Sequence, residues 1–116
     1  MPIVATLSIT DEGLSYQYFA NNTVKQVGFI KWSEIDSIDA FKRDMFSYDL
    51  ICIQISGPKS AQSEPIEIDE EDPKWEAVMV ALSKYLPQIK PWCEWFSAVA
   101  FPAFAINSLR IYERPN

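Results

Sequence analysis

Histidine is absent from this chain of 116 residues, and its absence excludes a large part of enzyme chemistry. Histidine is the commonest general base, a frequent neutral metal ligand and the usual side chain that titrates near neutral pH. Catalytic triads and cysteine–histidine pairs are therefore excluded within one chain. We expect a protein that is not an enzyme and that holds no cofactor and no metal ion. A small enzyme that uses a pair of carboxylates stays open as an alternative.

Cysteine is scarce, with only Cys52 and Cys93 and no C-x-x-C spacing. The opening MPIVATLSIT has no basic start and no apolar run of the length that a signal peptide needs, so we expect none. The expected state is two reduced thiols in the cytoplasm. Cys93 lies beside Glu94 with no cation nearer than Lys90, which favours an unreactive thiol.

Basic residues are outnumbered, with 10 Lys and Arg against 16 Asp and Glu, for a net charge of −6. Nucleic acids and anionic lipids both attract clustered positive charge, so we expect neither a nucleic-acid nor a membrane partner. Long hydrophobic runs are also missing: residues 92–106, WCEWFSAVAFPAFAI, contain Glu94, Ser97 and Pro102, whereas a spanning helix needs ~20 apolar residues. The charge instead favours a basic protein partner.

The chain is 48% hydrophobic, which is typical of a globular protein, and its length predicts a single domain over residues 1–116. Apolar residues alternate with period two as far as about residue 69 and then change to a helical period. We expect an α+β fold in which six to seven strands form an antiparallel, strongly curved sheet or half-barrel.

Two helices are expected after the first six strands. Asp72 is a good N-cap and Pro73 suits the first helical position, so the first helix should run from about 73 to 86. Its apolar stripe consists of Trp75, Val78, Met79, Leu82 and Leu86. Pro91 predicts a second, short helix over about 91–100, and renewed alternation predicts a last strand over about 104–112.

The segment EPIEIDEED, residues 64–72, holds most of the candidate site residues. It lacks the glycine and the ligand spacing of a calcium loop. Either it is a solvated strand end leading into a helix N-terminus, where negative charge is favourable, or it is a docking surface for a cationic partner. In the second interpretation the partner-binding residues are Glu67, Asp69, Glu70, Glu71 and Asp72.

Two further groups of residues are informative. A predicted hairpin is flanked by Lys42, Arg43, Asp44 and Asp49, and we expect surface ion pairs among these four. In the aromatic segment we expect Phe101 and Phe104 to be core residues. Trp92 and Trp95 are candidate partner anchors, and at least one of them should keep an edge exposed to solvent.

The segments ITDEGLSY and VGFIKWSEIDSI, in the N-terminal half, resemble the opening of bacterial pleckstrin-homology-like domains. There a D-x-G hairpin precedes a strand that ends in W-x-E-I-x-x-I. The resemblance implies a curved antiparallel sheet followed by a helix. The tail departs from that pattern, because pleckstrin-like domains normally end at the helix.

A second likeness covers more of the chain. The segments that carry it are IDAFKRDMFSYDLICIQI, IEIDEEDPKWEAVMVAL, YLP, WCEWFSAVAFPAF and NSLRIYER, and they resemble a group of short uncharacterised bacterial proteins. Such proteins are similar to bacterial immunity proteins in size and charge. The likeness to the uncharacterised group implies only a fold and a cytoplasmic location. The similarity to immunity proteins implies a protein-binding domain that neutralises a basic toxin domain with its acidic face. The alternative is a pleckstrin-like interaction module of unknown ligand.

Overall fold

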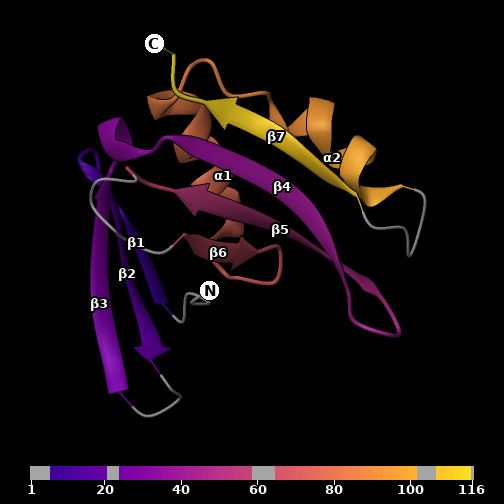
Figure 1. Cartoon of the computed structure of the whole chain (residues 1–116), viewed down its shortest axis with the longest axis horizontal. Coiled ribbons are helices and arrows are strands. Elements are labelled where there is room, and N and C mark those ends of the chain that lie inside the picture. Colours follow the sequence, from indigo (N-terminus) through magenta and orange to yellow (C-terminus); the bar gives the residue numbers. More distant parts are fainter. Residues whose placement is uncertain (1–5, 21–23, 59–64, 102–106, 116) are drawn as a thin grey trace.

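The computed structural model describes residues 6–20, 24–58, 65–101 and 107–115 (Figure 1). Seven strands, two α-helices and one short 3-10 helix lie in these residues. Their order is β1 (Thr6–Ile9), β2 (Gly13–Ala20), β3 (Val24–Lys31), η1 (Trp32–Glu34), β4 (Ser37–Asp44), β5 (Asp49–Ser56), β6 (Ile66–Asp69), α1 (Trp75–Tyr85), α2 (Trp92–Ala100) and β7 (Ser108–Glu113). The α+β class and the antiparallel pairing of the strands are confirmed.

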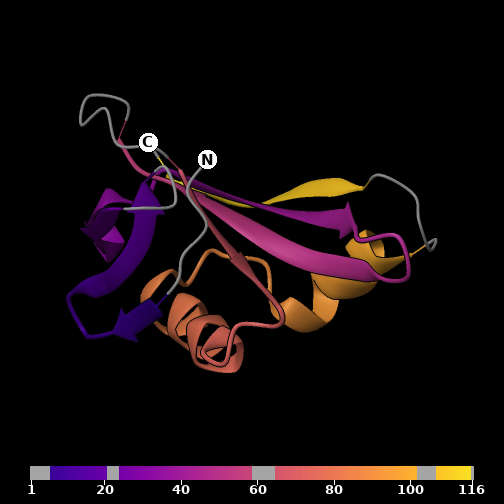
Figure 2. The same cartoon turned by 90° about the horizontal axis from the view of Figure 1, so that it is seen from below.

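The strands form two sheets, so the expectation of one continuous curved sheet is wrong. One sheet has the order β1-β2-β3 and the other the order β6-β5-β4-β7. The reason is the position of β7. In a simple meander β3 would pair with β4, but here β7, the last strand of the chain, pairs with that edge of β4. The two sheets meet at an angle and do not close into a barrel (Figures 1 and 2).

The change of sheet takes place at the turn between β3 and β4. Trp32, which is buried there, donates its indole N–H to the carbonyl of Thr10 at 3.0 Å. The backbone N–H of Asp36 then donates to Ser56, and the carbonyl of Asp36 accepts from Arg114, both at 2.8 Å. The turn is therefore tied through Trp32 to the connection between β1 and β2, and through Asp36 to the end of β5 and to the residue after β7, which keeps β3 and β4 in separate sheets.

Both helices lie on one face of the four-stranded sheet (Figure 2). That face carries the alternating branched residues that the sequence pattern identifies, and Ala40 leaves room among them. The strand residues in this layer are Ile38, Ala40, Ile51, Ile53, Ile55, Ile66 and Ile68. Burial of this continuous apolar layer is the main favourable contribution to the fold.

Helix α1 begins at Trp75, two residues later than expected. Asp72 does not cap the helix in the expected way, because its side chain accepts a hydrogen bond from the backbone N–H of Lys74 at 2.8 Å and forms a turn that includes Pro73. The predicted stripe is confirmed for Trp75, Val78, Leu82 and Leu86, which are buried, whereas Met79 is only partly buried. Helix α2 starts next to Pro91, as predicted.

The last strand, predicted over about 104–112, is β7, which the structure places at Ser108–Glu113. Asn107 lies outside the strand because its side-chain amide donates to the carbonyls of Val99 and Phe101, at the end of α2. Residues 104–106, including Phe104, lie outside the described residues.

Candidate functional site

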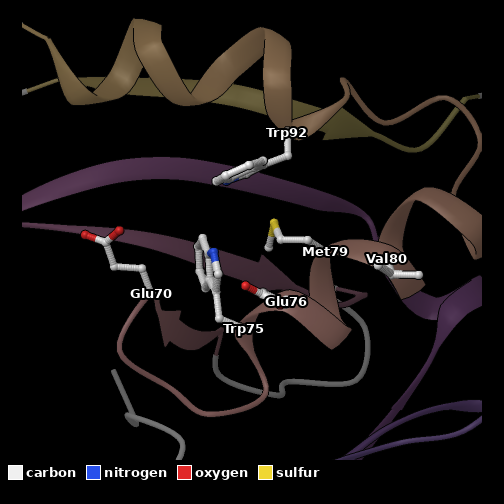
Figure 3. Close-up of a pocket in the computed structure, with 6 residues that line it drawn as sticks. All are labelled: Glu70, Trp75, Glu76, Met79, Val80 and Trp92. Carbon is white, nitrogen blue, oxygen red and sulfur yellow. The ribbon is translucent and has the colours of Figure 1, made fainter.

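A groove between α1 and α2 is the candidate site (Figure 3). It has a volume of about 380 Å³ and is lined by Glu70, Trp75, Glu76, Met79, Val80 and Trp92. The indole of Trp92 extends from the start of α2 towards Trp75 and Met79, which rise from α1 on the opposite side. The groove is thus an apolar and aromatic channel that carries two carboxylates.

The two candidate tryptophans have different positions in the structure. Trp95 is buried in the core, with 1% of its surface exposed, whereas Trp92 is 46% exposed. The expectation that one of them keeps a solvent-accessible edge is therefore confirmed. Phe101, in contrast, is 70% exposed and is not the core residue that was expected. The helix buries Trp95 and Val99 one turn apart and ends at Ala100, so Phe101 falls beyond its buried stripe.

Of the groove residues, the sequence predicted only Glu70 and Trp92 as site residues, and it did not predict Trp75, Glu76, Met79 or Val80 as part of the site. Met79 had been assigned to the core stripe, where it is only half-buried. Val80 lies off that stripe and is 69% exposed. An exposed branched apolar residue on the polar side of an amphipathic helix departs from the helical pattern, and this departure is the only sequence signal that points to this side of α1.

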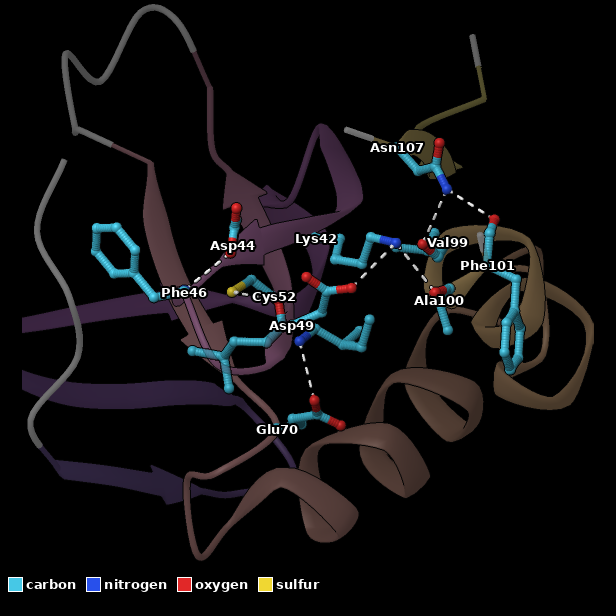
Figure 4. Close-up of polar contacts among 12 residues, drawn as sticks. Lys42, Asp44, Phe46, Asp49, Cys52, Glu70, Val99, Ala100, Phe101 and Asn107 are labelled. Carbon is cyan, nitrogen blue, oxygen red and sulfur yellow. Dashed lines mark hydrogen bonds and ion pairs between the residues drawn. The ribbon is translucent and has the colours of Figure 1, made fainter. Parts of the chain in front are cut away.

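Several carboxylates of the acidic segment accept hydrogen bonds from other groups of the protein. Glu70 accepts one from the backbone N–H of Ile51 at 3.0 Å (Figure 4), and Asp69 accepts one from the backbone N–H of Glu71 at 2.9 Å. A hydrogen bond with Glu71 raises the pKa of Tyr48. The segment is therefore an organised turn, and its acidic groups are oriented by hydrogen bonds with the backbone and with a tyrosine hydroxyl.

Glu67 occupies a position that differs from that of the other acidic residues. It is only 2% exposed, although the strand pattern had placed it towards solvent. Its carboxylate is bound to Arg43, and the charge of Glu67 raises the pKa of that guanidinium. This pair, which links β4 to β6, replaces the expected pairing of Arg43 with an aspartate. Glu67 therefore does not belong to an exposed acidic surface.

Lys42 holds α2 against the sheet (Figure 4). Its side chain is buried on the helix-covered face, where Nζ donates to the carbonyl of Ala100 at 3.0 Å and lies 3.4 Å from a carboxylate oxygen of Asp49. The expected surface ion pair is thus a buried one. A cation at the C-terminal end of a helix also complements the helix dipole. Together with Asn107, Lys42 fixes the position of α2 and so of Trp92.

The tip of the β4–β5 hairpin is a second exposed apolar feature. Phe46 is 98% exposed and has a φ of 73°, in the left-handed region that bulky side chains disfavour. The side chain of Asp44 accepts a hydrogen bond from its backbone N–H at 2.8 Å and holds this conformation (Figure 4). Met45 and Tyr48 are exposed beside it. The tip combines backbone strain with exposed apolar area.

A further hollow lies near the turn between the two sheets. It has a volume of about 510 Å³, and Trp32, Tyr85, Tyr112 and Arg114 are among its lining residues. The rings of Trp32 and Tyr85 stack on each other at 4.8 Å, and Arg114 pairs with Asp36 at 3.2 Å. Its aromatic faces and its cation are thus engaged within the protein, which makes it a weaker candidate than the groove.

The thiols do not form a reactive pair. Cys52 is fully buried in β5, and burial raises its pKa to about 12. Because the thiolate is the nucleophile, this thiol is inert near neutral pH. Cys93 is exposed on α2. Within the residues that the structure describes, no three His, Cys, Asp or Glu side chains are grouped so that they could hold a metal ion.

The chain matches no family model, no curated protein and no solved structure. Of the helices in the described ranges, none has both the length and the apolar character that crossing a bilayer requires.

The buried lysine generates the first prediction. Lys42→Met retains much of the side-chain length and removes the charge, so the ion pair with Asp49 and the hydrogen bond to Ala100 are both lost. We expect the free energy of unfolding, measured in urea, to fall by about 3 kcal/mol. The matched control is Lys90→Met at an exposed position, for which the change should stay within about 0.5 kcal/mol. Equal effects of the two substitutions would contradict the role assigned to Lys42.

The second prediction concerns pH. The pKa of Cys52 is about 12 in the folded protein, whereas an unfolded thiol titrates near ~8.5. The unfolded state therefore loses its proton first as the pH rises, so stability falls above about pH 8.5, by up to ~1.4 kcal/mol per pH unit. We expect Cys52→Ala to make the free energy of unfolding, measured in urea, fall less steeply with pH between about pH 8 and 10. Cys93→Ala serves as the control. A slope unchanged by Cys52→Ala would contradict the prediction.

The third prediction tests the strain at the hairpin tip. Phe46→Asn should raise the free energy of unfolding by about 1 kcal/mol, because Asn tolerates the left-handed region and the exposed ring makes little stabilising contact. Phe46→Ala is the matched control: it also removes the ring, but alanine disfavours the same φ. The test is thermal unfolding of the unchanged protein and of the two variants. An equal rise in the free energy of unfolding for both substitutions would show that backbone strain is not the cause.

Proposed function

We propose that this chain is a non-catalytic protein-binding domain that works in the cytoplasm and binds a basic partner at the groove between α1 and α2. The observation that carries the proposal is the half-exposed indole of Trp92, placed over an apolar groove beside Glu70 and Glu76. Tryptophan is enriched among the residues that dominate binding energy at protein interfaces. Acidic groups around such an anchor favour encounter with a basic surface and oppose acidic ones.

The net charge of −6 also favours a basic partner. A basic partner would be attracted over roughly the Debye length, ~8–10 Å at physiological salt, before any contact forms. We propose further that the partner is a basic bacterial toxin domain, and that the chain is its immunity protein. Its mechanism would be steric blockade: the chain covers the basic surface on which the toxin acts, and charge attraction speeds the association.

A pleckstrin-like interaction module is the second candidate function. The observation that favours it is the edge strand β3, which pairs with β2 alone among the described strands. Val27 and Phe29 on this strand are 70% and 47% exposed. Exposed strand edges can accept an additional strand from a peptide, with backbone hydrogen bonds providing affinity. In this alternative the partner binds the three-stranded sheet and leaves the groove empty.

The fourth prediction distinguishes the two functions. The product of the reading frame next to the gene of this protein is expressed in a bacterial host with and without the chain, and its binding is measured by calorimetry. We expect the neighbouring product to arrest growth alone and the chain to restore it. Trp92→Ala should weaken binding about 30-fold or more, because an interface anchor contributes ~2 kcal/mol.

Phe29→Ala is the control in this experiment, since it removes an exposed aromatic ring from the other candidate surface. Weakening by Phe29→Ala, with Trp92→Ala neutral, would support the sheet-edge module. A neighbouring product that is neither toxic nor bound would refute the immunity proposal.

A further inference from the structure

We infer that the groove binds an arginine side chain of the partner, with its guanidinium group placed between the indole face of Trp92 and the carboxylates of Glu70 and Glu76. The inference rests on the proposed function, because it names the chemistry by which the same groove would recognise a basic protein. It is carried by the size, the lining and the unbalanced charge of the groove.

Size limits what the groove can hold. Its volume of about 380 Å³ lies at the small end of the ~300–1,000 Å³ that is typical of ligand pockets. It therefore suits one long side chain better than a whole helix. Met79 and Val80 offer apolar surface along which the methylene groups of such a side chain can lie.

Charge determines the kind of side chain. Two carboxylates line the groove, and no lysine or arginine among the described residues does. Glu70 uses Oε1 to accept from Ile51, while Glu76 has no hydrogen-bond or ion-pair partner among the described residues. A purely apolar occupant would remove these carboxylates from water without compensation, which is unfavourable. A cation satisfies them.

The aromatic wall favours arginine over lysine. The planar guanidinium stacks on aromatic faces and can donate two parallel hydrogen bonds to one carboxylate, whereas an ammonium is a strongly hydrated point charge. The exposed indole of Trp92 provides the face, and tryptophan is the best of the aromatic partners for a cation. The ring of Phe96, 5.0 Å from that of Trp92 and inclined by 57°, supports the indole from its own helix.

The fifth prediction uses N-acetyl-L-arginine amide as the probe and the four tryptophan indole N–H signals in ¹H–¹⁵N NMR spectra as the readout. The signals are assigned with single Trp→Phe variants, and ionic strength is held constant with sodium chloride. We expect saturable shifts of the Trp92 and Trp75 signals with a dissociation constant on the order of 1–10 mM. The Trp32 signal is the internal control, because its N–H is bound to Thr10 outside the groove.

Two comparisons make the test specific. N-acetyl-L-citrulline amide has nearly the same shape as the arginine probe but no charge, and we expect it to bind at least tenfold more weakly. Glu76→Gln should weaken arginine binding about fivefold. Glu94→Gln is the matched control, since it removes the same charge from an exposed position of α2 that does not line the groove.

The outcomes separate this inference from the proposed function. Equal binding of the arginine and citrulline probes, or equal effects of Glu76→Gln and Glu94→Gln, would overturn the arginine assignment. The same holds if shifts at Trp92 are absent up to about 100 mM probe. If the protein partner nevertheless binds in a way that depends on Trp92, the proposed function stands and only the arginine site fails. If arginine binds but no basic protein does, the site stands and the proposed function fails.

Discussion

The buried charge of Lys42 is the constraint on which the arrangement of the second helix depends. An ammonium group on the helix-covered face of a sheet is stable only where its donors are satisfied, and here a carbonyl at the end of α2 and the carboxylate of Asp49 satisfy them. The helix therefore has to end above β4. Because its end is fixed, its first residue, Trp92, lies opposite α1, and the groove follows from that geometry.

The acidic residues have two distinct uses in this structure. Glu67 is buried and forms an ion pair with Arg43. Glu70, just after the end of β6, accepts a hydrogen bond from the backbone of Ile51 in β5. These carboxylates stabilise the fold and orient the turn that leads into α1. Glu76 is exposed and makes no such contact within the described residues, so its charge remains available to a ligand. Only part of the acidic groups is therefore available for the basic partner that we propose.

Much of the architecture was predictable because it depends on local patterns. The alternation of isoleucines in β5 and the stripe from Trp75 to Leu82 each follow from the period of one element, and Pro91 marks the start of α2. The division into two sheets was not predictable in this way. It depends on β7, which competes with β3 for the edge of β4 across a separation of many residues, and no local period records that choice.

The sequence by itself determined the class of the fold, the bounds of both helices to within about two residues, the acidity, and the absence of histidine chemistry. These properties depend on composition and on neighbouring residues along the chain. Only the tertiary structure decided that Trp92 is exposed while Trp95 is buried, that Glu67 is enclosed while Glu76 is free, and that the two helices enclose an apolar groove. The physical reason is that exposure depends on which distant elements cover a side chain. The hydrogen bonds of Lys42 and Asn107 hold the end of α2, and the pair with Arg43 holds Glu67.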